Sequence, residues 1–102
     1  MIHVIATVEL NDGKLEAFLA EFRRLVPQVL AERGCLEYAP AVDVPTGLAA
    51  QGGARPNTVT VVERWTDLPA LEAHLCAPHM VEYRPRVKEF VKGVKLQILQ
   101  PV

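Results

Sequence analysis

The chain has 102 residues, half of them apolar, and its 11 basic and 12 acidic side chains nearly cancel. This size predicts a single domain, residues 1–102, and the lack of a basic run argues against a nucleic-acid partner. No uncharged apolar run is long enough to cross a bilayer and the first residues do not resemble a signal peptide, so we expect no membrane insertion and a cytoplasmic location.

The first half of the chain predicts a strand, a long helix and a second strand. Apolar and polar residues alternate over 2–10, and apolar residues then recur every three or four positions over 15–30. The first pattern is typical of a strand and the second of an amphipathic helix. Pro27 should kink this helix and Gly34 should end it, because glycine readily adopts the left-handed cap conformation. Residues 35–43 again have the pattern of an extended segment.

The second half predicts a long loop, a strand, two helical pieces and a last strand. Residues 45–57 are rich in glycine and proline, whereas the β-branched run over 58–65 is typical of a strand. A helix should follow until Pro78 interrupts it, and a second helical piece should reach about Val91. Alternation over 94–100 predicts the last strand.

The order β-α-β-β-α-β is that of ferredoxin-like α+β folds, in which two helices cover one face of a four-stranded antiparallel sheet. The other face would carry Ile5, Leu36 and Leu99, which are too apolar to remain in water. A domain of this size buries little core, so we expect two copies to pair through these faces as a homodimer. The 45–57 loop is longer than a hairpin needs, and we expect it to reach over a pocket or to clasp the partner subunit.

The segment "LEAHLCAPHM" places His74 and His79 on either side of a helix-breaking proline. A metal site is disfavoured, because on an unbroken helix five residues turn about 140° and no third ligand is spaced to help the two histidines. A nucleophilic site is also disfavoured, because Cys35 and Cys76 belong to no paired motif and are expected to be small buried residues. An acid/base corner remains, in which the proline brings both imidazoles to one pocket.

Three further side chains are predicted to lie near this corner. Tyr83 follows His79 by four residues and so shares its helix face, and Trp65 ends a strand shortly before the first helix. Glu63 lies on the same strand face as Trp65. Beneath a helix layer its carboxylate would need a partner side chain, because an unpaired buried charge is costly. The structural alternative is that Trp65 only fills the core and that a histidine only lines the helix junction.

Several segments together resemble the antibiotic biosynthesis monooxygenase superfamily, and within it the bacterial quinol monooxygenases: "GCLEYAP", "ERW", "LEAHLCAPHM" with Tyr83, and the terminal "ILQP". The resemblance covers essentially the whole chain. It implies a dimeric α+β barrel with a pocket between sheet and helices in each subunit. It also implies oxidation of dihydroxy-aromatic, naphthoquinol-like substrates by molecular oxygen, without flavin, haem or metal.

The resemblance gives most weight to Trp65, His74 and His79, and the residues suit the chemistry it implies. A quinol becomes a good one-electron donor to oxygen once it loses a proton, so the protein needs a base, a polar contact to the phenolate and a dry aromatic slot. Either histidine is a candidate base. The predicted substrate-binding residues are Trp65, Tyr83, Tyr38, Phe22, Met80 and Glu63.

Three alternatives stay open, and the first two come from other members of the superfamily. Haem-degrading relatives use an asparagine on the first strand, where this chain has Ala6, so that activity is disfavoured. Isomerases of a phosphorylated autoinducer-2-type signal would need an anion site, for which Arg64 and Arg84 are the candidates. The third alternative is a non-catalytic dimeric quinone-binding protein.

Overall fold

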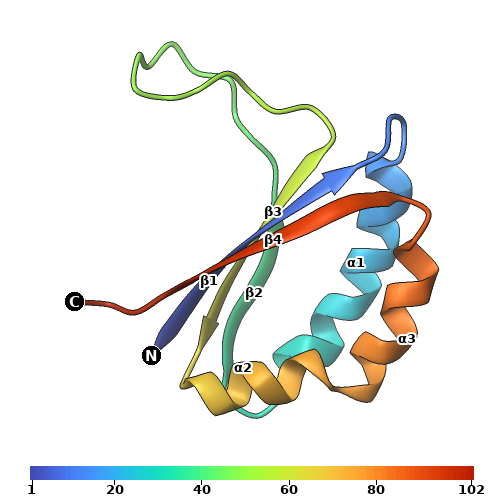
Figure 1. Cartoon of the computed structure of the whole chain (residues 1–102), viewed down its shortest axis with the longest axis vertical. Coiled ribbons are helices and arrows are strands. Elements are labelled where there is room, and N and C mark those ends of the chain that lie inside the picture. Colours follow the sequence, from blue (N-terminus) through green and yellow to red (C-terminus); the bar gives the residue numbers. More distant parts are fainter.

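An antiparallel sheet with the strand order β2-β3-β1-β4 forms the centre of the computed structural model, which describes residues 1–102 (Figure 1). Helices pack on one of its faces, so the predicted ferredoxin-like βαββαβ arrangement is confirmed. The elements are β1 (Ile2–Leu10), α1 (Leu15–Leu30), β2 (Cys35–Ala41), β3 (Thr58–Trp65), α2 (Leu68–Leu75), α3 (Pro78–Val87) and β4 (Val91–Leu99).

Two helix ends differ from the prediction. The helix α1 ends at Leu30, and Gly34 lies beyond it in a turn, with a φ of 84°. The helix α3 ends at Val87 and not near Val91, because Val91 already pairs with β1 and the Asn11 N–H donates to the Phe90 carbonyl at 2.8 Å. Sheet pairing therefore overrides the helical pattern at this end of the chain.

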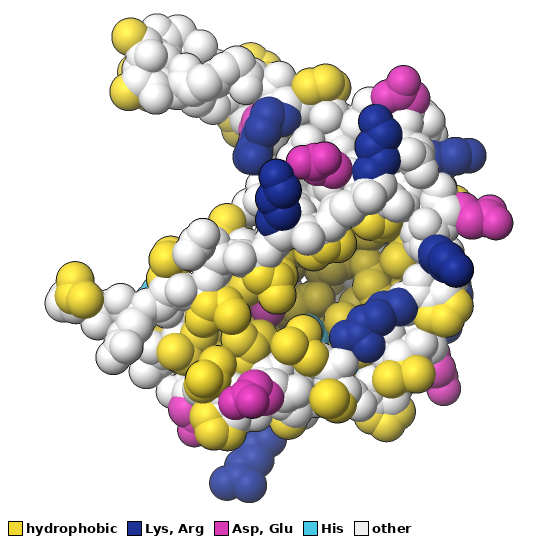
Figure 2. Space-filling view, in the orientation of Figure 1, with side chains coloured by type: hydrophobic (Ala, Val, Ile, Leu, Met, Phe, Trp, Pro, Cys, Tyr) yellow, Lys and Arg dark blue, Asp and Glu magenta, His cyan; other side chains and the backbone are white.

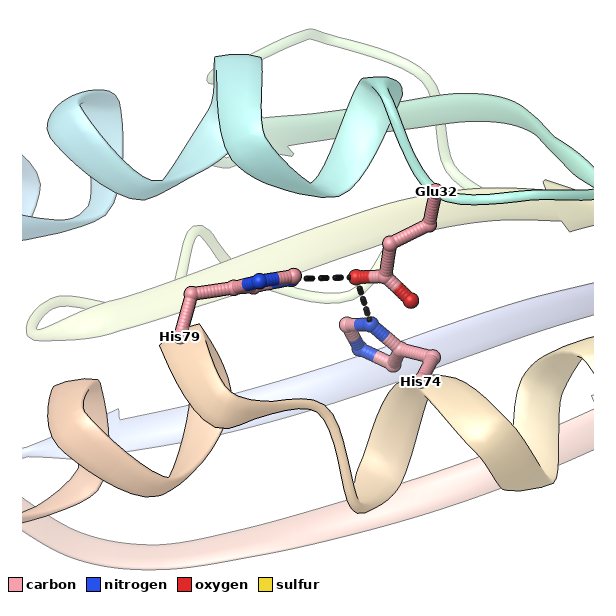
Figure 3. A group of neighbouring side chains, drawn as sticks. All are labelled: Glu32, His74 and His79. Carbon is pink, nitrogen blue, oxygen red and sulfur yellow. Dashed lines mark hydrogen bonds and ion pairs between the residues drawn. The ribbon is translucent and has the colours of Figure 1, made fainter.

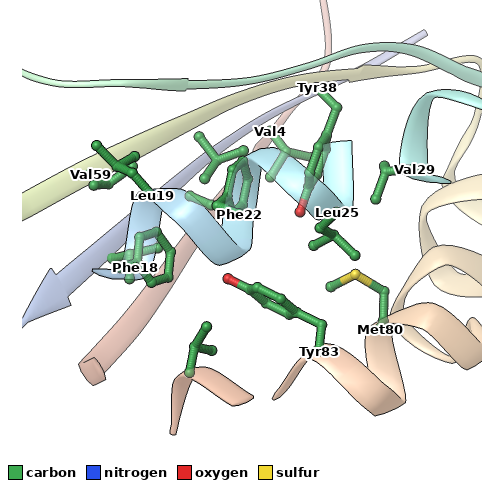
Figure 4. Packing of buried hydrophobic residues seen from close by; sticks show 14 of the residues in the cluster. Val4, Phe18, Leu19, Phe22, Leu25, Val29, Tyr38, Val59, Met80 and Tyr83 are labelled. Carbon is green, nitrogen blue, oxygen red and sulfur yellow. The ribbon is translucent and has the colours of Figure 1, made fainter. Parts of the chain in front are cut away.

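The core lies between the sheet and α1. From Val4 to Leu10 of β1 and from Val59 to Trp65 of β3, every second side chain points toward the helices and is buried, as the period of two requires. Phe18, Phe22, Leu25 and Val29 of α1 pack onto this surface (Figure 4). Full burial of each such side chain stabilises the fold by about 1.5–3 kcal/mol.

The strand β4 lies at the edge of the sheet, and its helix-facing side chains are not covered. Val94, Leu96 and Ile98 pair with the buried positions of β1, yet they are 56%, 45% and 44% exposed. Figure 2 shows the result, an apolar hollow on this side of the molecule. The uncovered edge is where the candidate site begins.

The opposite face of the sheet carries part of the apolar surface that the sequence predicted. Ile5 lies there between Val62 and Gln97, and Leu99 pairs with His3 and is 43% exposed. Leu36 lies at an irregularity between β2 and β3 and is also exposed. No helix of the chain is both long and apolar enough to cross a membrane.

Residues 42–57, here called the arm, extend away from the body of the molecule (Figure 1). At its base, the Arg55 guanidinium donates to both carboxylate oxygens of Asp43 at 2.8 and 2.9 Å, and this contact lowers the pKa of Asp43 to about 2. Val44 and Leu48 are 66% and 71% exposed on the arm. The arm is thus tied at its base and presents apolar side chains to solvent.

The two cysteines differ in burial. Cys35 is half-buried on β2, where burial raises the pKa of its thiol to about 11. Cys76 is exposed, so the expectation that both are buried is wrong for this residue. It directly follows α2, in the break that Pro78 imposes between the two helices, and no core element covers this position.

Gly34 generates a prediction about stability. A methyl group added there would lie 2.6 Å from Thr66 Oγ1 and 2.7 Å from Ala70 Cβ, and the positive φ already disfavours alanine. We expect Gly34→Ala to lower the free energy of unfolding in urea by about 2–4 kcal/mol.

Two glycines serve as controls for this substitution. Gly13 has a φ of 75° but open space around it, and Gly47 has neither strain nor neighbours within 4 Å. Gly13→Ala should cost about 1 kcal/mol and Gly47→Ala less than about 0.5 kcal/mol. Equal losses for Gly34→Ala and Gly13→Ala would mean that the close approach to α2 contributes nothing.

Candidate functional site

A cavity of about 760 Å³ lies between the sheet and the helices and opens beside β4 (Figure 2). Of its 19 lining residues, 14 are hydrophobic, so the interior is a largely apolar slot. Six of the eight side chains predicted from the sequence line it, namely Phe22, Tyr38, Glu63, His74, Met80 and Tyr83. Trp65 and His79 do not.

Trp65 lies behind the wall of the cavity. Its side chain is fully buried, so it offers no surface for the predicted stacking on a substrate ring. Its indole N–H donates to Glu63 Oε1 at 3.0 Å, and its ring lies 4.8 Å from the ring of His74, centroid to centroid. Trp65 therefore supports two polar residues of the cavity and does not line it.

Glu32 is a member of the site that the sequence analysis missed. It lies in the turn after α1, and its Oε2 atom lies 2.8 Å from His74 Nδ1 and 2.6 Å from His79 Nε2 (Figure 3). Glu32 is 42 residues from His74 along the chain, so no local spacing connects them. The topology does, because the α1–β2 and β3–α2 connections lie at the same end of the sheet.

The contacts of Glu32 define the tautomer of His74. An ionised carboxylate only accepts hydrogen bonds, so His74 carries its proton on Nδ1 and has a free lone pair on Nε2. Nε2 has no hydrogen-bond partner in the protein. Every fully buried side-chain nitrogen or oxygen does have a partner, so Nε2 is not fully buried. Because His74 lines the cavity, this atom is accessible from it. Burial lowers the pKa of His74, against the opposing effect of Glu32, and this favours the neutral imidazole.

The same three side chains are the residues that could hold a metal ion. The carboxylate oxygen and the two imidazole nitrogens lie within 4.8 Å of one another, and this donor set suits zinc or iron. The expectation that no third ligand would accompany the histidines is therefore wrong, because folding supplies Glu32. All three atoms are already hydrogen-bonded, however, and an ion would have to displace both bonds.

Three further polar groups face the cavity. Burial is the main cause that raises the pKa of Glu63 to about 7, against the hydrogen bond from Trp65. Burial also raises the pKa of the Tyr38 and Tyr83 phenols, which therefore stay protonated. Neither hydroxyl has a protein partner, and both point into the space beside Phe22 (Figure 4).

The arrangement suits proton transfer from an aromatic substrate. A neutral imidazole with an open lone pair accepts a proton, and two phenolic O–H groups can donate to the anion that forms. Phe22 stacks on Tyr38 at a centroid distance of 5.3 Å, which leaves flat apolar walls around the polar end of the cavity. The other lining side chains are mostly apolar, so a ligand that fills the cavity would displace water and strengthen these contacts.

Comparison with known proteins places these residues in context. The model of the family "Antibiotic biosynthesis monooxygenase" matches residues 1–86. Over 103 aligned residues, the chain is 41% identical to "Probable quinol monooxygenase YgiN" of Escherichia coli K12, with 99% of this chain and 98% of that protein covered.

Solved structures are similar in fold. PA3566 from Pseudomonas aeruginosa superposes with a TM-score of 0.80 at 28% identity, covering 99% of this chain and 93% of that one. Rv0793 from Mycobacterium tuberculosis gives a TM-score of 0.78 at 26% identity, covering 99% and 94%. The likeness thus extends over nearly the whole of each chain.

The raised pKa of Glu63 predicts a pH-dependent stability. Folding favours the protonated carboxyl, so its contribution is fully present below the ordinary pKa of 4.5 and is lost as the pH rises through about 7. The Glu63→Gln variant keeps an acceptor for the Trp65 N–H but does not titrate. Between about pH 4.5 and pH 8, the stability of the wild type relative to this variant should fall by about 3 kcal/mol in urea unfolding. A constant difference would show that Glu63 ionises normally.

Proposed function

The chain belongs to the antibiotic biosynthesis monooxygenase family, and we propose that it is a quinol monooxygenase that oxidises dihydroxy-aromatic substrates with molecular oxygen. We further propose that it needs no flavin, haem or metal. The main support for this proposal is the Nε2 atom of His74, which has no protein partner and faces an apolar cavity. The other ring nitrogen, Nδ1, is hydrogen-bonded to Glu32.

In the proposed reaction, His74 is the base. A quinol hydroxyl gives its proton to Nε2, and the imidazolium that forms is stabilised by Glu32, which accepts from Nδ1 at 2.8 Å. Tyr38 and Tyr83 donate hydrogen bonds to the resulting phenolate, and Phe22 and Met80 hold the ring. His79 reaches Glu32 but not the cavity, so its role is to position Glu32.

The phenolate then supplies the electrons. Transfer of one electron to oxygen gives a semiquinone and superoxide. If these couple and the His74 imidazolium returns its proton to the resulting peroxide, the ring gains one oxygen atom and the other leaves as water. If the semiquinone instead gives superoxide a second electron and its remaining hydroxyl proton, and the imidazolium returns the first proton, the products are the quinone and hydrogen peroxide. Both routes balance without a bound cofactor, and the apolar walls exclude water from the reacting atoms.

A homodimer is part of this proposal. The sheet face opposite the helices carries Ile5, Val62 and Leu99, and pairing of two such faces would remove them from water. The exposed Val44 and Leu48 of the arm provide a further apolar surface for a partner subunit. Together these surfaces support the expected dimeric barrel.

The proposed function is tested by oxygen uptake with a reduced naphthoquinone, with a chelator present throughout. We expect the metal-free protein to consume oxygen well above the spontaneous rate. His74→Ala should lower kcat by about 10²- to 10⁴-fold, because a positioned base is lost, and added imidazole should restore part of the rate.

His3→Ala is the matched control, because His3 lies on β1 at a position that faces away from the cavity. It should keep the wild-type rate, and sedimentation should show the wild-type assembly, because His3 lies on the sheet face that we propose pairs in the dimer. Full turnover by a folded His74→Ala variant would contradict the assignment of the base. Quinone binding by the wild type without any oxygen uptake would indicate the non-catalytic binding protein instead.

The arm generates a separate prediction. Replacing residues 42–57 by a two-residue turn removes Val44, Leu48 and the Asp43–Arg55 pair. If the arm clasps a partner, sedimentation should show a weaker dimer, or quinone affinity should fall. A shortened protein that keeps both properties would make the arm a passive connection between β2 and β3.

A further inference from the structure

The ionisable side chains that line the cavity form two separate groups. Glu63 and His74 are buried at 5% and 2% exposure, whereas Arg84 of α3 and Lys88, directly after it, also line the cavity but are exposed. The acid/base chemistry is therefore at the buried end, and the two cations lie at the rim. Figure 2 shows basic side chains beside the apolar hollow.

Neither cation is neutralised by the protein. Arg84 lies on α3, and Lys88 directly follows the helix and keeps its backbone conformation. The two side chains, four residues apart, therefore share one face, and neither takes part in any ion pair. Their neighbour Arg86, in contrast, pairs with Glu21 at 3.1 Å. Two like charges at this spacing repel each other, so the pair is unfavourable unless an anion lies between or beside them.

Arg84 is also fixed in place. Its Nη2 atom donates to the Leu75 carbonyl at the end of α2 at 2.6 Å, which leaves its other N–H groups without a protein acceptor. Its charge is close enough to His74 to contribute to the lowered pKa of that imidazole. The guanidinium is therefore anchored at the rim of the cavity, within electrostatic reach of His74, and still has free N–H donors.

We propose that Arg84 and Lys88 form an anion subsite, and that the preferred ligands are two-ring aromatics that carry an acidic substituent such as a carboxylate. The inference extends the proposed function, since the aromatic part occupies the cavity assigned to the quinol. The phenolic end of such a ligand meets His74 and the tyrosines, and its carboxylate meets the two cations. The cavity volume of about 760 Å³ leaves room for a substituted two-ring system.

The test uses 2-naphthoate and 2-naphthamide, which have nearly the same shape and differ in charge. Neither carries quinol hydroxyls, so calorimetric binding does not depend on oxygen chemistry. We expect the carboxylate to bind about tenfold more tightly than the amide at about 0.05 M salt, and the preference to shrink at about 0.5 M as the exposed charges are screened.

Three variants define the subsite. Lys88→Gln should lower the carboxylate preference about threefold, and the double variant with Arg84→Gln should abolish it. The Lys88 side chain is exposed and makes no hydrogen bond or ion pair within the protein, so its variant tests the charge with little effect on the fold. Arg23→Gln removes a charge that is exposed on α1 and does not line the cavity, and it should keep the full preference.

The outcomes separate this inference from the proposed function. Equal affinity for the two probes, no binding of either probe, or an unchanged preference in the double variant would overturn the anion subsite, whatever the oxygen uptake. A carboxylate preference that depends on Lys88 and Arg84, in a protein that consumes no oxygen with any quinol, would support the subsite and overturn the monooxygenase proposal.

Discussion

The whole candidate site depends on the close approach of two turns at one end of the sheet. The Thr66 N–H donates to the Gly34 carbonyl at 2.9 Å, and the space beside Gly34 is too small for even a methyl group. This contact brings the turn that carries Glu32 beneath the start of α2. If the turns were further apart, the Glu32 carboxylate would not reach both His74 and His79.

Glu32 and Trp65 provide hydrogen-bond partners for the buried polar groups of the candidate site. Buried polar groups cost free energy unless they are hydrogen-bonded, and here each buried side-chain polar atom has a partner. One carboxylate oxygen serves two imidazoles, and one indole N–H serves Glu63. The groups left without protein partners are those that open into the cavity. The polar groups of the site that lack a protein partner are thus the ones that a ligand can contact.

Local sequence patterns predicted most of the fold and much of the site. Period-two and helical repeats gave the element order, and the strand period correctly placed Glu63 on the same face as Trp65. The end of α3 was misjudged, because pairing of Val91 with Leu10 depends on a strand more than 80 residues away. Glu32 was missed for the same reason, since only tertiary contacts bring it to the histidines.

Trp65 and His79 show a second limit of sequence patterns. Both have the residue type and spacing of cavity-lining groups, but whether a side chain faces a cavity or lies behind its wall depends on packing. His74 and His79 meet the same carboxylate from the two sides of the break at Pro78, and only His74 also reaches the cavity. No pattern of residues distinguishes the two.

The position of β4 links assembly to ligand access. Its outer edge is unpaired, and a free edge with apolar side chains is a template onto which another strand can add. Val94 and Leu96 belong both to this edge strand and to the cavity lining. Any chain that covers the helix-facing side of β4 therefore also narrows the entrance to the cavity. Protection of this edge against aggregation and control of substrate entry are thus requirements placed on the same few residues.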